Sequence, residues 1–201
     1  MKERFGFFLV GLFFLTLGVS VIIKANVGAS PWDALAVGQA NMFGITIGTS
    51  VFINGIILII INAILLKKKP EILAGVTIFV IGMIMDIWLV HVLDTFNPTT
   101  LLAQYTALFV GIFLYGLGIA IYLQANFPAG PMDSVMVAVS TRFNLSLRTA
   151  RFITDGSALL LAVAFKGAIG LGTIIVTILL ALVVQMLHPV FARLMKRLTV
   201  A

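Results

Sequence analysis

The chain has 201 residues, of which 61% are hydrophobic and 10% are charged, and its mean hydropathy is +1.19. Because about one quarter of a soluble domain is charged, this composition indicates an integral membrane protein, in one membrane domain over residues 1–201. The absence of cysteine excludes thiolate chemistry, and two histidines are too few for a convincing metal site. Membrane topology explains the net charge of +6 better than binding to nucleic acid does.

The first half of the chain, residues 5–93, contains three apolar segments and one interruption. Residues 5–23 carry no charge and are long enough to span a bilayer. The segment Ala-Asn-Val-Gly-Ala-Ser-Pro-Trp-Asp at 25–33 then predicts a break in the helix, with Ser30 as the cap of a new helix that begins at Pro31. This new helix is expected to end near Phe43, so it is too short to cross the bilayer. After a cap at Thr46, residues 49–66 and 72–90 predict two further spans around a charged turn at 67–71.

The second half, residues 101–197, repeats this order. It predicts spans at 105–123, 149–165 and 170–187, and a short helix at 131–143 that follows Ala-Asn-Phe-Pro-Ala-Gly-Pro-Met-Asp at 125–133. Between positions 11 and 55, fourteen residues are identical at an offset of one hundred. This doubling of Asn-x-x-Ala-x-Pro-x-Asp in register indicates an internal repeat.

The positions of lysine and arginine predict the topology. With six spans and a cytoplasmic N-terminus, eleven of the thirteen Lys and Arg residues lie on the cytoplasmic side, and so does the C-terminus. Three spans per repeat is an odd number, so the halves are inverted. We therefore expect an all-α membrane protein of six transmembrane helices in two inverted three-helix repeats, each with a re-entrant short half-helix, as in many secondary transporters.

Polar residues in and beside the apolar segments are the candidate substrate- or ion-binding groups. Asp33 and Asp133 occupy the third positions of the two short helices, where each could simply cap its own helix, and a helix N-terminus favours their charged form. Asn26 and Asn126 either satisfy the broken backbone or offer an amide to a ligand. With Gln185 and the intramembrane acids, the candidates are Asn26, Ser30, Asp33, Asn126, Asp133, Asp86, Asp155 and Gln185.

Asp86 and Asp155 differ from the other acids because they lie inside predicted spans and are not repeated. A carboxylate in a span costs roughly 2.5–3.5 kcal/mol unless it is paired, protonated or hydrated. Desolvation favours the neutral form, so these two are the better proton carriers. The structural alternatives are an ion pair between Asp155 and Arg151 one turn earlier, and a partly hydrated interfacial position for Asp86. With Asp155 held ionised, Asp86 is the expected carrier.

The doubled Asn-x-x-Ala-x-Pro-x-Asp, the Phe-x-[Ile/Leu]-[Thr/Ser] segments that follow it and Gly-Leu-Gly-Thr at 170–173 resemble the YczE/YyaS/YitT family of bacterial integral membrane proteins. The length is closer to the YczE branch. The resemblance implies a location in the bacterial cytoplasmic membrane. It implies little chemistry and no catalytic residue: transport has been supposed for the family on architecture, and some members are linked to the production of lipopeptide metabolites.

We expect a permease for an unidentified small solute, with proton coupling through Asp86 or Asp155 as one option. No hydrolase signature is present, so we expect no enzyme activity, no catalytic residue, no cofactor and no metal. Two other functions stay open: an accessory or regulatory membrane protein that packs against a partner, and a flippase for a lipid or lipid-linked metabolite. The expected partners are the lipid bilayer and a small solute, with a homodimer or another membrane protein also compatible, and no nucleic acid.

Overall fold

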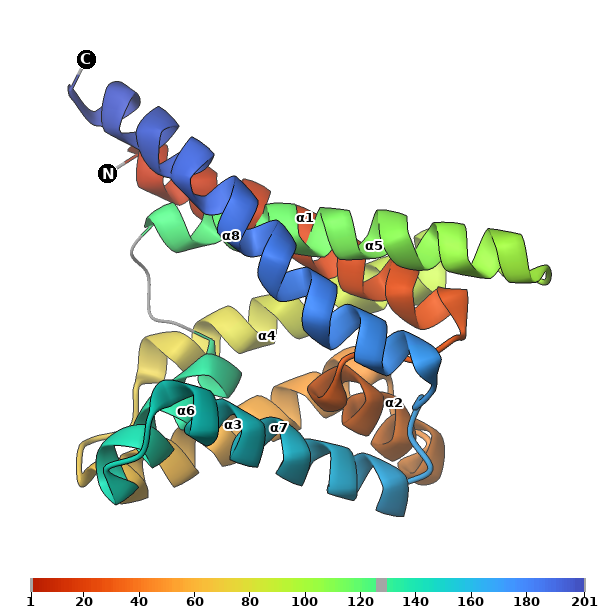
Figure 1. The fold of residues 1–201 in the computed structure, drawn as a ribbon, viewed down its shortest axis with the longest axis horizontal. Helices are drawn as coiled ribbons and strands as arrows, with labels where there is room; N and C mark the ends of the chain where they lie inside the picture. The colour runs from red at the N-terminus through yellow and green to blue at the C-terminus, as the bar shows by residue number, and fades with distance from the viewer. Residues whose placement is uncertain (1, 126–129, 201) are drawn as a thin grey trace. The chain divides into compact units, whose positions relative to one another are not determined.

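The computed structural model describes residues 2–125 and 130–200, with side chains for 4–125 and 130–196. All regular structure in these residues is helical (Figure 1). The elements are α1 (Lys2–Ala25), α2 (Pro31–Phe43), α3 (Ile47–Leu66), α4 (Ile72–Asp86), the π-helix η1 (Ile87–Val92), α5 (Leu101–Tyr122), the 3-10 turn η2 (Leu123–Ala125), α6 (Pro131–Phe143), α7 (Leu147–Ala164) and α8 (Leu171–Val200).

The helix starts predicted from local signals are confirmed. Helices α2 and α6 begin at Pro31 and Pro131, with Gly130 as the N-cap of α6. The Thr46 hydroxyl accepts a hydrogen bond from the amide N–H of Thr49, which caps α3 as expected. Proline is accepted at the first helical position because that residue needs no amide donor. The two breaks therefore lie where the sequence placed them.

Two spans differ in detail from the prediction. The third span continues as a π-helix to Val92, where the amide of Leu93 donates to the carbonyl of Trp88 at 2.7 Å. The last helix was expected to end at residue 187, but α8 runs on to Val200 with Pro189 inside it. The carbonyl of Pro189 accepts from Nε of Arg193 at 3.2 Å, so a side chain supports the helix just after the proline.

The chain divides into two compact units, which share both halves of the sequence. Unit 1 contains α1, η1, α5, η2 and α8, and unit 2 contains α2, α3, α4, α6 and α7. The boundary at 86–87 coincides with the change from α4 to the π-helix. Each unit is therefore assembled from elements of both predicted repeats.

Close packing of α1 on α5 holds unit 1 together (Figure 1). A Cβ added to Gly18 would lie 2.7 Å from the carbonyl oxygen of Gly111, and a Cβ added to Gly118 would lie 2.7 Å from that of Gly11. Real side chains do not approach backbone so closely. Small residues let two helix backbones approach in this way, and such contacts are common between membrane helices.

The contacts between α1 and α5 are antiparallel and reciprocal. Along α1, Gly11 faces Tyr122 and Gly18 faces Tyr115, so contacts advance along α1 as they retreat along α5. The same pairs recur with the halves exchanged: Gly111 faces Ile22, and Gly118 faces Leu15. This exchange at an offset of one hundred is the pattern that a two-fold axis produces.

Unit 2 pairs the short helices with longer helices of the other half. Helix α2 packs on α7, and α6 packs on α3. Helix α4 packs on α3, where Gly48 and Gly82 meet so closely that a Cβ on Gly82 would lie 2.5 Å from the Gly48 carbonyl oxygen. The exchange of α2 and α6 between halves parallels the reciprocity of α1 and α5.

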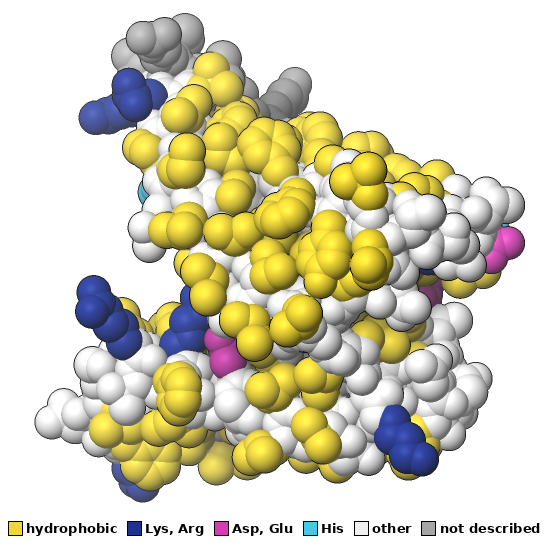
Figure 2. All heavy atoms as spheres, turned by 45° about the vertical axis from the view of Figure 1, so that its right-hand side comes forward, with side chains coloured by type: hydrophobic (Ala, Val, Ile, Leu, Met, Phe, Trp, Pro, Cys, Tyr) yellow, Lys and Arg dark blue, Asp and Glu magenta, His cyan; other side chains and the backbone are white. Residues whose placement is uncertain are grey.

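In the part of the chain that the structure describes, five helical segments are long and apolar enough to span a membrane, namely Arg4–Ala25, Ile47–Leu66, Ile72–Val92, Leu101–Ala125 and Leu171–Lys196. Many large apolar side chains on them are exposed, for example Ile72 at 81% and Leu102 at 81%, and Figure 2 shows hydrophobic side chains over much of the visible surface. This pattern suits contact with lipid, so the chain is a multi-pass membrane protein. Helix α7, which corresponds to the fifth of the six predicted spans, is not among these segments because Arg148, Arg151 and Asp155 lie within its 18 residues.

We predict that Gly18→Ala and Gly118→Ala both destabilise the protein, and to a similar extent, because each added methyl group meets backbone of the opposite helix. Gly6→Ala on the same helix α1 is the matched control, since a Cβ there has no neighbour within 4 Å. Alanine at an unobstructed helical position is favoured over glycine by about 1 kcal/mol. The temperature of thermal unfolding in detergent measures all three. Equal stability of Gly18→Ala and Gly6→Ala would contradict the packing.

Candidate functional site

The first break is braced within unit 1 by the start of α8. Asn26 ends α1 with a φ of 55°, a left-handed conformation that asparagine tolerates, and its side chain is exposed. The carbonyl of Val27 accepts from the amide of Gly172 at 2.8 Å. A Cβ on Gly28, where φ is 118°, would lie 2.8 Å from the amide nitrogens of Gly170 and Thr173. The Gly-Leu-Gly-Thr motif therefore packs against the irregular backbone of the first break and hydrogen-bonds to it. Asn26 supplies the left-handed residue at which α1 ends.

Unit 2 contains a buried polar cluster beside the first short helix. The amide oxygen of Gln39 on α2 accepts from Ser50 Oγ and Asn54 Nδ2 on α3, each at 2.7 Å. Ser50 and Asn54 are 1% and 5% exposed, and Asp33 at the start of α2 is also buried. Polar groups in an apolar helix pair must find partners in one another, so this cluster fixes α2 against α3.

Asp86 caps the N-terminus of α3 from the end of α4. One carboxylate oxygen accepts from Thr46 Oγ1 at 2.6 Å, and the other accepts from the amide of Gly48 at 2.8 Å. Carboxylates are favoured at helix N-termini, where amide donors lack partners. Two hydrogen bonds therefore give this carboxylate a structural role, and its role as a proton carrier stays a prediction.

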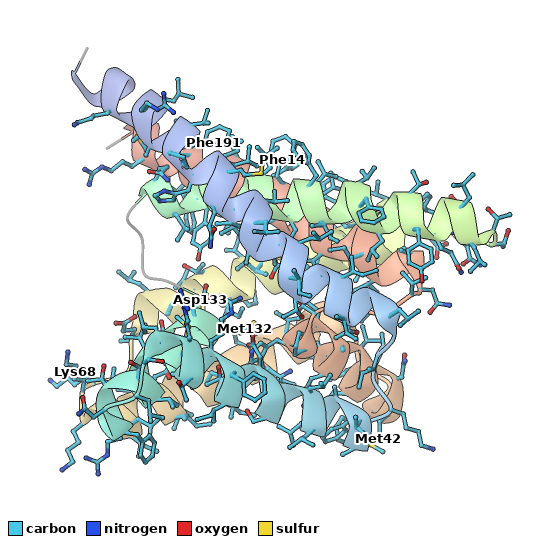
Figure 3. All side chains as sticks on the ribbon, in the orientation of Figure 1. Phe14, Met42, Lys68, Met132, Asp133 and Phe191 are labelled. Atoms are coloured by element: carbon cyan, nitrogen blue, oxygen red, sulfur yellow. The ribbon has the colours of Figure 1, made fainter. Side chains whose placement is uncertain are left out.

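The second short helix brings a group of charges together in unit 2. Asp133 lies at the start of α6 (Figure 3), and on α7 Nε of Arg151 lies 3.4 Å from Oδ2 of Asp155. The ion pair expected for Asp155 is thus confirmed. Desolvation raises the pKa of Asp133 from its ordinary value, while Arg151 lowers it and Asp155 raises it. The side chain of Asp133 is itself exposed, and the expectation that the helix N-terminus keeps this aspartate charged stays a prediction.

A small cavity of about 70 Å³ lies beside α6 at the turn between α3 and α4. Its lining comprises Ile59, Asn62, Ala63, Leu66, Lys68, Lys69, Glu71, Ala74, Pro131 and Ser134. Asn62 is 8% exposed, and its Nδ2 donates to the carbonyl of Pro131 at 3.2 Å. The cavity therefore lies against the backbone that opens the second short helix.

The structure brings some predicted site residues together and leaves others apart. Arg151 and Asp155 lie close enough to Asp133 for their charges to act on it, whereas Asp86 caps the end of α3 opposite to Asn62, about 21 Å along the helix axis. Ser30 directly precedes α2, and Gln185 lies at an exposed position of α8 in unit 1. Asn126 lies outside the described residues. Within residues 2–125 and 130–200, no three His, Asp or Glu side chains gather as a metal site requires.

Sequence reasoning missed Gln39, Ser50, Asn54 and Asn62. Ser50 and Asn54 are four residues apart and Asn62 follows eight residues later, so all three fall near one face of α3. That polar stripe in an otherwise apolar span was the available signal, because polar groups inside a span mark functional or packing sites. None of the four is repeated in the second half, where Val139, Ala150, Thr154 and Ala162 stand at an offset of one hundred.

We predict that Asp86→Leu lowers the free energy of unfolding by about 1–3 kcal/mol, because it leaves the Gly48 amide and the Thr46 hydroxyl without their acceptor. Asp86→Asn, which keeps an acceptor oxygen, should lose less. Asp94→Leu, in the loop after η1, is the matched control for replacing an aspartate by leucine. Denaturant unfolding in mild detergent gives the comparison, and an Asp86→Leu protein as stable as the control would rule out the capping role.

Three curated relatives and one family model match this chain. The model of a family of unknown function, DUF6198, matches residues 2–189. The chain is similar to "Uncharacterized protein YyaS" of Bacillus subtilis (34% identical, covering 94% of each chain) and to "Uncharacterized membrane protein YczE" of the same organism (29% identical, covering 92% of this chain and 86% of the relative). An "Uncharacterized protein" of Haemophilus influenzae is 34% identical over 92% of this chain and 84% of its own.

No solved structure gives a significant match. The resemblance to YyaS and YczE proteins inferred from the doubled motif is confirmed by the two Bacillus relatives, one of which carries the description of a membrane protein. The family match covers nearly the whole chain. The chain therefore belongs to the DUF6198 family of unknown function.

Proposed function

We propose that the protein is a permease for a small solute, built from six transmembrane helices in two inverted repeats. The observation that carries this proposal is the reciprocal, antiparallel contact between α1 and α5. Two helices that occupy equivalent positions in the repeats and run antiparallel cross the bilayer in opposite directions. Inverted repeats of this kind, with broken helices that hold the substrate near the midplane, recur among secondary transporters.

Helix α7 is the sixth crossing in this proposal. Its obstacle is the charge of Arg148, Arg151 and Asp155, but the Arg151–Asp155 ion pair at 3.4 Å offsets part of the cost of Arg151 and Asp155. Arg148 lies in the first turn and can reach the interface. Helix α7 also occupies the same position in the second repeat as α3 does in the first, and α3 is long and apolar enough to span a membrane.

The charged group at the start of α6 is the proposed place of proton coupling. Asp133 is the acid whose neutral form the surrounding protein favours, and its balance depends on Arg151 and Asp155. A raised pKa makes the neutral form of Asp133 easier to reach than that of a free aspartate. A proton-coupled carrier requires a carboxylate that can take up a proton from one side of the membrane and release it to the other.

We propose a location in the bacterial cytoplasmic membrane with both termini in the cytoplasm, and no enzymatic step. This orientation places eleven of the thirteen Lys and Arg residues on the cytoplasmic side, as the positive-inside rule favours. It also places the 67–71 turn, next to the Asn62 cavity, at the cytoplasmic surface. A single chain contains both repeats, so the proposal does not require a second copy.

Labelling of single cysteines tests the topology, and the natural chain contains none that would interfere. We predict that Lys68→Cys and Arg142→Cys react only with reagent supplied from the cytoplasmic side. Asn97→Cys and Ile169→Cys should react from the opposite side. The pair at 142 and 169 tests α7 by itself. Labelling of both from one side would show that α7 does not cross and would remove the inverted arrangement.

Transport is tested by screening solutes for a rise in the unfolding temperature and then measuring uptake of each stabilising solute into proteoliposomes. We expect at least one class of solute to be taken up faster at acidic external pH. Asp133→Asn, which cannot exchange a proton, should abolish this pH dependence while the protein stays folded. Asp94→Asn serves as the control, with pH-dependent uptake as in the wild type. Solutes that bind without entering vesicles would favour the hypothesis of an accessory or regulatory membrane protein. Movement of labelled lipid between the two leaflets would favour the flippase hypothesis.

A further inference from the structure

The Asn62 cavity in unit 2 has an orphan hydrogen-bond acceptor. Asn62 is more than nine-tenths buried, its Nδ2 donates to the Pro131 carbonyl, and its Oδ1 has no hydrogen-bond partner among the side chains and backbone that the structure describes. Exchanging the two amide atoms would place oxygen against the carbonyl oxygen of Pro131, so the orientation is set. A buried acceptor without a donor destabilises the folded protein. An occupant of the cavity that donates a hydrogen bond would recover this energy.

The rest of the lining describes that occupant further. Ile59, Ala63, Leu66 and Ala74 make the wall largely apolar, and the charged members are Lys68, Lys69 and Glu71, all on the exposed turn between α3 and α4. Figure 3 shows Lys68 at this turn. Two lysines and one glutamate leave one net positive charge. This matches the single negative charge of a phosphate diester better than the two charges of a monoester.

We propose that this cavity binds the phosphate ester of a small polyol: a hydroxyl group of the ligand donates to Asn62 Oδ1, and the phosphate lies against Lys68 and Lys69. The charge match favours a lipid headgroup such as phosphatidylglycerol, and a soluble glycerol phosphate offers the same hydroxyl and phosphate groups with one more negative charge. Only the first half of the chain carries the site, because Ala162 stands where Asn62 would recur. The site is separate from the transport proposal and stands whether or not the protein transports a solute.

The experiment compares probes of equal charge with and without hydroxyl groups in the headgroup. The purified full-length protein in neutral detergent is titrated with phosphatidylglycerol or with phosphatidylmethanol, which has the same charge but no hydroxyl in its headgroup, and the unfolding temperature is followed. We expect tighter binding of phosphatidylglycerol. Glycerol 1-phosphate and methyl phosphate form the soluble pair: discrimination in this pair identifies a free phosphate ester as ligand, and discrimination in the lipid pair alone identifies a lipid.

Variants assign the effect to the cavity. Lys68→Gln combined with Lys69→Gln should weaken binding of both lipids about tenfold, the loss expected for two partly exposed charge contacts. Lys67→Gln is the matched control, because Lys67 belongs to the same lysine run but does not line the cavity, and it should bind as the wild type does. Asn62→Leu should bind the two lipids equally, since its side chain can no longer accept a hydrogen bond.

Three results would overturn the proposal. Equal binding of the hydroxylated and methylated probes by the wild type would mean that water alone satisfies Asn62. A loss in Lys67→Gln as large as in the double variant would mean that binding follows general charge and not the cavity. Retained discrimination in a folded Asn62→Leu protein would place the hydroxyl elsewhere. If Asn62→Leu fails to fold, the wild-type comparison and the lysine variants still decide the question.

Discussion

Polar groups in a chain this apolar have few partners except one another, and this constraint explains most of the specific contacts in the structure. Each interruption of a helix is satisfied by a segment far away in sequence. The first break bonds to the start of α8 through Val27 and Gly172, and the start of α6 accepts from Asn62. Irregular backbone at membrane depth is tolerated only where protein or water satisfies it in this way.

The same constraint gives Asp86 its role. A carboxylate at the end of an apolar helix is costly unless donors surround it, and the N-terminus of α3 supplies two of them. The close approach of Gly48 and Gly82 brings α3 and α4 together at this point. Packing of small residues and satisfaction of a polar group thus depend on each other, since the hydrogen bonds form only when the helices are close.

The packing of α1 on α5 follows the internal repeat, whereas three polar groupings depart from it. The glycines that join α1 and α5 occur in both halves and meet reciprocally. The Gln39–Ser50–Asn54 cluster, the Asn62 cavity and the Arg151–Asp155 pair each occur once. A duplicated scaffold with unduplicated polar groups is the arrangement expected when structure is shared by the halves and each half has its own ligand or ion chemistry. This division supports looking for function in the unrepeated residues.

The sequence by itself determined the helical class, the membrane location, the two breaks and the caps at Thr46 and Gly130. These depend on local properties: the length of an apolar run, the fixed φ of proline and the amides of a first helical turn. Tertiary structure alone decided that Asp86 caps α3, that Asp133 lies within the electrostatic influence of the Arg151–Asp155 pair, and that Asn62 lines a cavity. Such contacts join residues 38 to 69 positions apart in the chain for Asp86 and Asn62. Helix packing brings those partners together, and no local pattern encodes which helix faces meet.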